Sequence, residues 1–202
     1  TDERRDFFKN NNIFFESLFD VQWTDEMLEK DFNNLTAPSI MPNVTDYSNP
    51  LKVYRFCFDD TRYLVNIKEY LENCIKISQR VMKNINFFEY KKVLFLGTEE
   101  CMFPSVFTAK FIEDYFNIQA FCHSTTRSPI AVCTADNYPI HNGYKIYSFY
   151  DSERINYIYN LDKYDAAIII SDSYKWSAKA LYGLDNILDK HDIKQRFYFL
   201  GD

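Results

Sequence analysis

The sequence contains no apolar run long enough to cross a bilayer and no cluster of basic residues, and these two absences exclude broad classes of protein. A membrane-spanning helix needs about 20 consecutive, mostly apolar residues. Proteins that bind nucleic acid gather Lys and Arg on one surface, whereas here 23 Lys and Arg are scattered among 29 Asp and Glu and the net charge is −6. We therefore expect a soluble protein that contacts no membrane, and the composition argues against nucleic acid.

The five cysteines show no paired spacing, which bears on redox compartment and on metal binding. They lie at positions 57, 74, 101, 122 and 133, mostly within apolar runs, and none forms a C-x-x-C pair. This pattern favours neither a disulfide framework nor a zinc site. The charged start, TDERRD, is unlike a signal peptide. We expect a cytoplasmic protein without a bound metal, while the sequence identifies no cofactor and leaves the oligomeric state open.

The first 50 residues differ in composition from the remainder, which predicts two parts. We expect the polar residues 1–12 to be a frayed terminus or the tail of a linker. Apolar residues at helical spacing then predict short helices over residues 13–19 and 24–32. Residues 33–50 contain three prolines with several Asn and Ser, a composition that is typical of an extended linker. We predict a helical N-terminal segment with its linker over residues 1–50 and a folded domain over residues 51–202.

The folded part is organised around a short apolar run, VLFLG, at residues 93–97. A continuous apolar run that ends in glycine is typical of a parallel strand covered on both faces. Pro104 suits the first turn of a helix, where its missing N–H is not needed, and apolar residues follow at helical spacing as far as Phe116. A second strand is expected over residues 118–122. A strand, a helix and a further strand in this order are typical of an α/β fold.

Further elements extend this unit in both directions. The patterns predict a strand over residues 52–58, a helix over 63–88, a buried strand over 166–170, a helix over 175–190 and a last strand over 197–200. A short strand is expected over residues 131–135, and residues 144–150 and 155–161 form either an edge hairpin or an ordered loop. The predicted fold class is α/β, a Rossmann-like, open and mainly parallel sheet of at least four strands with helices on both faces.

Three polar segments follow the predicted strands, at residues 98–103, 123–130 and 171–173. Open α/β sheets bind ligands at the carboxyl ends of their strands. The second segment, HSTTRSPI, places Arg127 among hydroxyl side chains, and a guanidinium fork suits a phosphate or a carboxylate. The alternative is that Arg127 only ties its loop down by pairing with a glutamate of the first segment.

We therefore predict a site for a phosphorylated ligand at this edge. The ligand-binding candidates are the polar side chains of the three segments: Thr98, Ser124, Thr125, Thr126, Arg127, Ser128 and Asp172. Glu99 and Glu100 are the catalytic candidates, because adjacent carboxylates in a cleft can have separated pKa values and so act as acid and base. They could equally bind a ribose hydroxyl or a metal, or lie in solvent with one of them capping the helix that follows.

A cysteine and a histidine in the first two segments suggest a different chemistry. Cys101 and His123 lie in neighbouring loops in this arrangement, which admits a thiolate nucleophile. The alternative is a buried cysteine and a surface histidine, and it is the commoner outcome.

The same segments carry a resemblance to a known family. GTEECMFP (97–104) and STTRSPI (124–130) resemble the signature of the TRSP domain, which is named after the tetrapeptide at residues 126–129. The resemblance continues, in order and spacing, through DNYPI (136–140), Gly143, YD (150–151), YIYN (157–160) and YD (164–165). It covers about residues 50–202.

The resemblance implies a setting that composition and spacing do not reveal. Members of the family typically follow a phosphoribosyltransferase-like domain, occur with bacterial tellurite-resistance stress genes, and are thought to act in the metabolism of a nucleotide-like compound. Asp172 after its strand is similar to the acid that holds PRPP in phosphoribosyltransferases, and residues 97–104 resemble their pyrophosphate loop in position. That family, however, usually has a pair of acids and then Thr-Thr-Gly, whereas residues 171–174 (SDSY) contain one acid and no glycine. We therefore predict a companion to a transferase, not an intact transferase site.

Two functions follow as hypotheses, and the sequence leaves open whether the chain is an enzyme. In the first, it is a ligand-binding or catalytic domain that acts on a phosphorylated, nucleotide-like (phosphoribosyl) small molecule. In the second, it is a non-catalytic interaction module that docks onto a phosphoribosyltransferase domain or subunit, as the helical N-terminal segment and its linker suggest.

Overall fold

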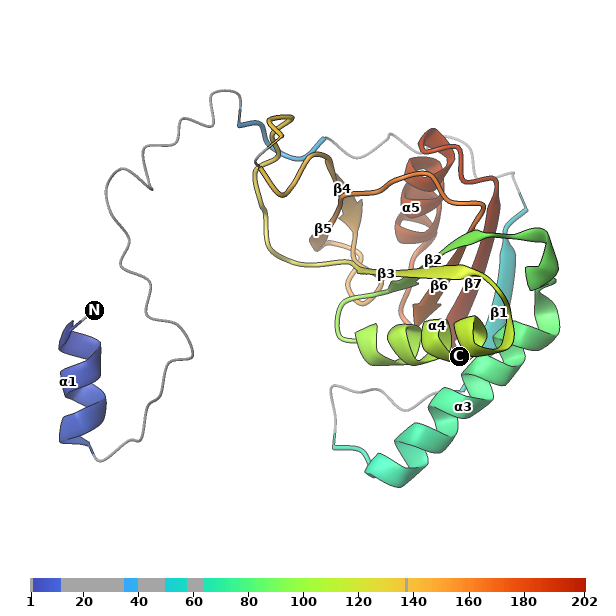
Figure 1. Ribbon diagram of the computed structural model, residues 1–202, viewed down its shortest axis with the longest axis horizontal. Coiled ribbons are helices and arrows are strands. Elements are labelled where there is room, and N and C mark those ends of the chain that lie inside the picture. The colour runs from blue at the N-terminus through green and yellow to red at the C-terminus, as the bar shows by residue number, and fades with distance from the viewer. Residues whose placement is uncertain (1, 12–34, 40–49, 58–63, 137) are drawn as a thin grey trace. The chain divides into compact units, whose positions relative to one another are not determined.

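The computed structural model describes residues 2–11, 35–39, 50–57, 64–136 and 138–202 (Figure 1). The chain divides into two compact units, residues 1–33 and residues 34–202. Within the described ranges, no helix combines the length and the apolar character that crossing a membrane requires.

The first unit contains α1 (Asp2–Asn10). The expectation of a frayed terminus is therefore wrong for these residues. The segment has no Gly or Pro, and Lys9 lies in its last turn, where a positive charge interacts favourably with the helix dipole. The two helices predicted over residues 13–19 and 24–32 lie outside the described residues.

The second unit is built on a five-stranded sheet with the order β1-β7-β6-β2-β3, in which all neighbours are parallel. Its strands are β1 (Lys52–Phe56), β2 (Lys92–Gly97), β3 (Gln119–Ser124), β6 (Ala166–Ser171) and β7 (Gln195–Gly201). The chain passes from β2 to β3 on one side and then returns to place β6 on the other side of β2. The strand order therefore reverses between β2 and β6, which is the kind of position where open α/β sheets bind ligands.

Helices cover both faces of this sheet (Figure 1). One face packs against α3 (Ile67–Asn84) and α4 (Met102–Tyr115), and the other against α5 (Ala178–Lys190) and a hairpin of β4 (Gly143–Tyr147) and β5 (Ile155–Tyr159). A short 3-10 helix, η1 (Phe87–Glu89), precedes β2. Along β2, Phe95 points into the core under α3 and α4, while its neighbours Leu94 and Leu96 point into the core under α5. The predicted α/β class with helices on both faces is thus confirmed.

The hairpin resolves the alternative that the sequence leaves open after residue 143. β4 and β5 pair antiparallel in a small sheet of their own, and neither lies at an edge of the main sheet. The strand predicted over residues 131–135 is wrong, because only Val132 pairs there, in an isolated bridge with Thr36. Ser39 likewise pairs with Tyr144 of β4. Residues 35–39, part of the predicted linker, therefore lie against the α/β unit.

Side-chain caps explain why α3 and α5 begin later than the apolar pattern predicts. The Asn66 side chain accepts hydrogen bonds from the backbone N–H groups of Lys68 and Glu69, at 3.0 and 3.3 Å, so α3 begins at Ile67. The Ser177 hydroxyl accepts from the N–H of Ala180 at 3.2 Å. Such caps satisfy first-turn N–H groups that have no partner within the helix.

Substitution of Gly97 tests the packing at the end of β2, and Gly183 in α5 provides a control. A Cβ at Gly97 would lie 2.5 Å from the carbonyl oxygen of Cys101, so we expect Gly97→Ala to lower the free energy of unfolding by about 1–3 kcal/mol. A Cβ at Gly183, within α5, would meet no atom within 4 Å, so Gly183→Ala should raise it by about 0.5–1 kcal/mol. Urea denaturation with unchanged m-values measures both changes. Equal effects of the two substitutions would contradict this account of Gly97.

Candidate functional site

The strand register brings the first two predicted segments together at the carboxyl edge of the sheet. Gly97 at the end of β2 pairs with Ser124 at the end of β3 and, on its other side, with Ile170 of β6. Hydrogen bonds continue beyond the strands, because the N–H of Thr125 donates to the Gly97 carbonyl at 3.1 Å and that of Thr98 to the Ile170 carbonyl at 3.2 Å. The loops after β2, β3 and β6 therefore leave the sheet at one level.

A pocket of about 360 Å³ lies between the loops after β2 and β3. Its lining combines carboxylates, hydroxyls, one guanidinium and one thioether: Glu99, Glu100, Met102, Ser124, Thr125, Thr126, Arg127 and Ser128. Seven of the nine predicted site residues are therefore in one place. Among the described residues, no three His, Cys, Asp or Glu side chains are placed to hold a metal ion.

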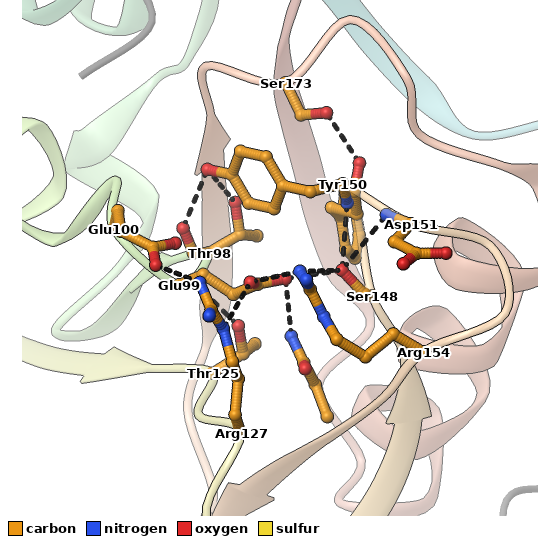
Figure 2. A network of polar contacts seen from close by, with 12 residues as sticks. Thr98, Glu99, Glu100, Thr125, Arg127, Ser148, Tyr150, Asp151, Arg154 and Ser173 are labelled. Carbon is orange, nitrogen blue, oxygen red and sulfur yellow. Dashed lines mark hydrogen bonds and ion pairs between the residues drawn. The ribbon is translucent and has the colours of Figure 1, made fainter. Parts of the chain in front are cut away.

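Glu99 turns inward from the pocket wall and is held by the hairpin (Figure 2). Its side chain is only 2% exposed. One carboxylate oxygen accepts from Ser148 Oγ at 2.5 Å and from Asn156 Nδ2 at 2.6 Å, and the other accepts from Arg154 Nη2 at 2.5 Å. We call these four residues the Glu99 cluster. A buried carboxylate is tolerated when it is paired and hydrogen-bonded in this way.

The cluster keeps Glu99 ionised. Burial raises the pKa of Glu99, but the hydrogen bonds from Ser148, Arg154 and Asn156 and the charge of Arg154 outweigh burial, and the pKa lies below its ordinary value. The backbone of Glu99 has a φ of 48°, which is uncommon for a residue other than glycine, and its N–H donates to Thr125 Oγ1 at 2.9 Å. The glutamate is thus fixed at both its backbone and its side chain.

Arg127 reaches the same carboxylate from the pocket side (Figure 2). Its Nε donates to Glu99 Oε2 at 3.3 Å, and its Nη2 pairs with Glu100. The Arg127 side chain is nevertheless 53% exposed and that of Glu100 40%. The geometry therefore combines the two alternatives for Arg127, since the guanidinium contacts both glutamates yet borders the open pocket. Neither glutamate caps α4, because its N-cap residue is Cys101, no side-chain cap hydrogen bond is made there, and the first turn contains no acid.

Strand β5 positions the loop that carries Arg127. Thr126 and Tyr157 form an isolated antiparallel bridge, with N–H to carbonyl distances of 2.9 and 2.7 Å. The Tyr159 hydroxyl donates to the Ser128 carbonyl at 2.9 Å and accepts from the N–H of Ile130 at 2.6 Å. The residues on both sides of Arg127 are therefore anchored to the hairpin, which leaves its side chain as the adaptable part of the loop.

Thr98 and Asp172 come together as well, but beneath the hairpin turn and not in the pocket lining. Both residues are buried, and the Tyr150 side chain lies between them at the point where the strand order reverses. The Tyr150 hydroxyl lies 2.9 Å from the Thr98 carbonyl oxygen and also contacts an Asp172 carboxylate oxygen; with one proton it can donate to only one of them at a time. Contact of a ligand with Thr98 or Asp172 stays a prediction, and it would require the turn to move.

The two residues proposed for thiolate chemistry lie on opposite faces of the sheet. Cys101 is fully buried in the core under α3 and α4. His123 lies 3.2 Å from the Tyr159 carbonyl oxygen through Nδ1 and 3.3 Å from the Tyr164 hydroxyl through Nε2, and Tyr164 belongs to the core on the other face. The expectation that Cys101 and His123 lie close together is therefore wrong. Alternation of side chains along β3 causes the separation.

Sequence reasoning missed the part of the site that the hairpin contributes. Ser148, Tyr150, Arg154 and Asn156 lie in or next to the β4–β5 turn, where the sequence pattern is weak. Only Tyr150 lies within a motif that the sequence analysis singled out.

Two polar atoms of the Glu99 cluster are not satisfied by the part of the chain that the structure describes. Nε of Arg154 and Oδ1 of Asn156 are buried and have no hydrogen-bond partner among the described residues.

Comparison with known protein families gives a match that covers all the residues lining the pocket. Residues 59–189 match a family model described as "TRSP domain C terminus to PRTase_2". This confirms the resemblance found in the two loop motifs, over a slightly shorter range. Neither the curated proteins nor the solved structures gave a match.

The two glutamates should differ sharply in their effect on stability. Glu99→Gln leaves Arg154, whose side chain is 34% exposed, without its charged partner and weakens a buried hydrogen-bond network, so we expect a loss of about 1–3 kcal/mol in the free energy of unfolding. Glu100→Gln removes an exposed pair and should cost about 0–1 kcal/mol. Urea denaturation measures both variants. Similar losses, or a larger one for Glu100→Gln, would show that Glu99 does not hold the loops.

His123 should make stability depend on pH. Burial lowers its pKa more than the hydrogen bond to Tyr159 raises it, so the folded state favours the neutral ring. That contribution is fully present above the ordinary pKa of about 6.5 and is lost as pH falls through the lower folded-state pKa. His123→Gln should reduce the fall in the free energy of unfolding between about pH 7 and pH 5. The same pH dependence in the variant and the wild type would contradict this assignment.

Proposed function

Because the chain belongs to the TRSP domain family, whose description places it C-terminal to a PRTase_2 domain, we propose that its pocket binds a phosphorylated small molecule of the phosphoribosyl type. The observation that carries the proposal is the position of Arg127. Its half-exposed guanidinium borders a pocket that is otherwise lined largely by hydroxyls. A planar fork of donors beside hydroxyls is suited to a phosphate group.

The charges around the pocket decide how an anion could enter. Glu99 and Glu100 lie against Arg127, and Arg154 lies on the far side of Glu99. The two carboxylates are thus balanced by two guanidinium groups, so the empty pocket carries no net positive charge. An anionic ligand gains by displacing Glu100, whose exposed pair with Arg127 is worth only about 0–1 kcal/mol. Glu99 stays in place because Arg154 continues to neutralise it.

The size and polarity of the pocket fit a small metabolite. Its volume of about 360 Å³ is at the lower end of the range for ligand sites, which is about 300–1,000 Å³. The hydroxyls of Ser124, Thr125, Thr126 and Ser128 line the same space and can donate to a phosphate or accept from a sugar hydroxyl. A displaced Glu100 carboxylate would be free to accept from a ribose hydroxyl.

Binding is better supported than catalysis. Glu99 is buried and its carboxylate accepts four hydrogen bonds, so proton transfer there would have to break several of them. Glu100 is exposed and lines the pocket, which makes it the better placed of the two catalytic candidates. Two parts of the proposal rest on the family resemblance. One is that the domain acts chemically on the ligand, and the other is that it works with a transferase in a bacterial stress response such as tellurite resistance.

Arg127 provides the direct test. Ribose 5-phosphate, PRPP and nucleoside monophosphates, each with and without Mg²⁺, are to be screened for a rise in Tm. We expect at least one to stabilise the wild type, and Arg127→Ala to abolish that response while changing the free energy of unfolding by only about 0–1 kcal/mol.

Arg80→Ala is the matched control, since Arg80 is an exposed arginine on α3 that does not line the pocket. It should keep the ligand response. An undiminished response in Arg127→Ala would remove Arg127 from the site, and a large stability loss with no ligand found would make it a structural residue.

A further inference from the structure

Exposed apolar side chains gather on two adjacent helices beside the pocket. On the chain leading into α3 and on its first half they are Leu64, Val65, Ile67, Leu71 and Ile75, and on the first turns of α4 they are Met102, Phe103 and Val106. We call these eight residues the α3/α4 apolar surface. The Phe103 ring stacks on that of Tyr70 of α3 at a centroid distance of 5.8 Å, which joins the two parts.

The apolar face of α3 is wider than the core that it covers. Tyr70, Cys74 and Ile77 form the row that packs into the unit. Ile67 and Leu71 belong to a second row at a spacing of four residues, and Ile67 is 70% exposed. Residues four apart are neighbours on a helix surface, so this row is a continuous stripe. A stripe of this kind, next to a helix face that is already buried, marks an interaction surface.

The surface continues to the rim of the ligand pocket. Met102 belongs to both, because it is half exposed and also lines the pocket. A partner that covered Met102 and Phe103 would therefore lie next to Arg127 and Glu100. Methionine and phenylalanine are enriched in the cores of protein interfaces, and methionine adapts its shape to a partner.

We propose that the α3/α4 apolar surface docks a phosphoribosyltransferase domain of the PRTase_2 type. Two observations select this partner over a second copy of the chain. The description of the family places this domain C-terminal to a PRTase_2 domain, and where two such domains share one polypeptide, a short flexible tether raises their effective concentration to the millimolar range. The surface also adjoins the pocket, so the docked transferase would lie beside a phosphoribosyl ligand; this second argument rests on the proposed function.

The test uses a pair of variants with unchanged net charge. Ile67→Gln/Leu71→Gln removes the apolar stripe at two exposed positions, and Glu72→Gln/Lys76→Gln alters two exposed polar positions on the same helix. Each purified chain is titrated calorimetrically with a separately purified PRTase_2 domain from a fused member of the family. We expect the wild type and the control to bind, and Ile67→Gln/Leu71→Gln to weaken binding by about tenfold or more.

The outcomes separate this proposal from the ligand site. The apolar variant should keep the ligand-induced rise in Tm, which shows that it folds and that the pocket is intact. Absence of a complex with the wild type, or equal affinity in both variants, would overturn docking. Sedimentation of the chain alone tests whether the surface instead binds a second copy of the chain. If the wild type is a dimer and Ile67→Gln/Leu71→Gln is a monomer, the surface is a dimer interface and the proposal is overturned.

Discussion

The ion pair between the buried Glu99 carboxylate and Arg154 holds the candidate site together. Removing a carboxylate from water is costly, and the cost is offset only when donors surround it in good geometry. Here the donors come from the hairpin, through Ser148, Arg154 and Asn156, while Thr125 on the loop after β3 accepts from the backbone of Glu99. Through its backbone and its side chain, Glu99 thus joins the loops after β2 and β3 to the turn that covers them.

This arrangement gives the two arginines around Glu99 different tasks. Arg154 lies on the hairpin side, at 2.5 Å from the carboxylate, and also donates to Ser148 at 3.0 Å. Arg127 lies on the pocket side, with a longer contact of 3.3 Å to Glu99 and an exposed pair with Glu100. Since Arg154 alone keeps Glu99 neutralised, Arg127 can turn to a ligand without leaving an unpaired buried charge. The loop stays rigid while its guanidinium remains exchangeable.

The hairpin also explains why the pocket lies beside β2 and β3 instead of at the reversal of the strand order. The Tyr150 hydroxyl contacts both Thr98 and Asp172 at the place where doubly wound sheets usually hold their ligand. Burial and the neighbouring Asp172 carboxylate raise the pKa of Tyr150, so it remains a neutral donor over the physiological range. Asp172, the acid that resembles part of a transferase site, therefore helps to fasten the turn to the sheet through Tyr150.

The sequence predicts the sheet well because each buried strand is a local pattern. VLFLG at β2 and AAIII at β6 are continuous apolar runs, and both become fully covered strands. Loop positions at the carboxyl ends follow from parallel topology, so the grouping of Ser124–Ser128 with Glu99 and Glu100 could be predicted. The inward turn of Glu99 could not, because a positive φ at a glutamate and its pairing with Arg154, 55 residues away, leave no local pattern. The weakly alternating segments around residue 150 likewise gave no sign that they fold over the site.

The central claim is that Arg127 exchanges partners while Arg154 does not. It is tested most directly by following the NMR signals of the two guanidinium groups during a titration with ribose 5-phosphate. The account predicts that the Arg127 signals shift with saturation and that those of Arg154 stay where they are. A shift of Arg154 with Arg127 unchanged, or no change in either while the ligand demonstrably binds, would contradict it.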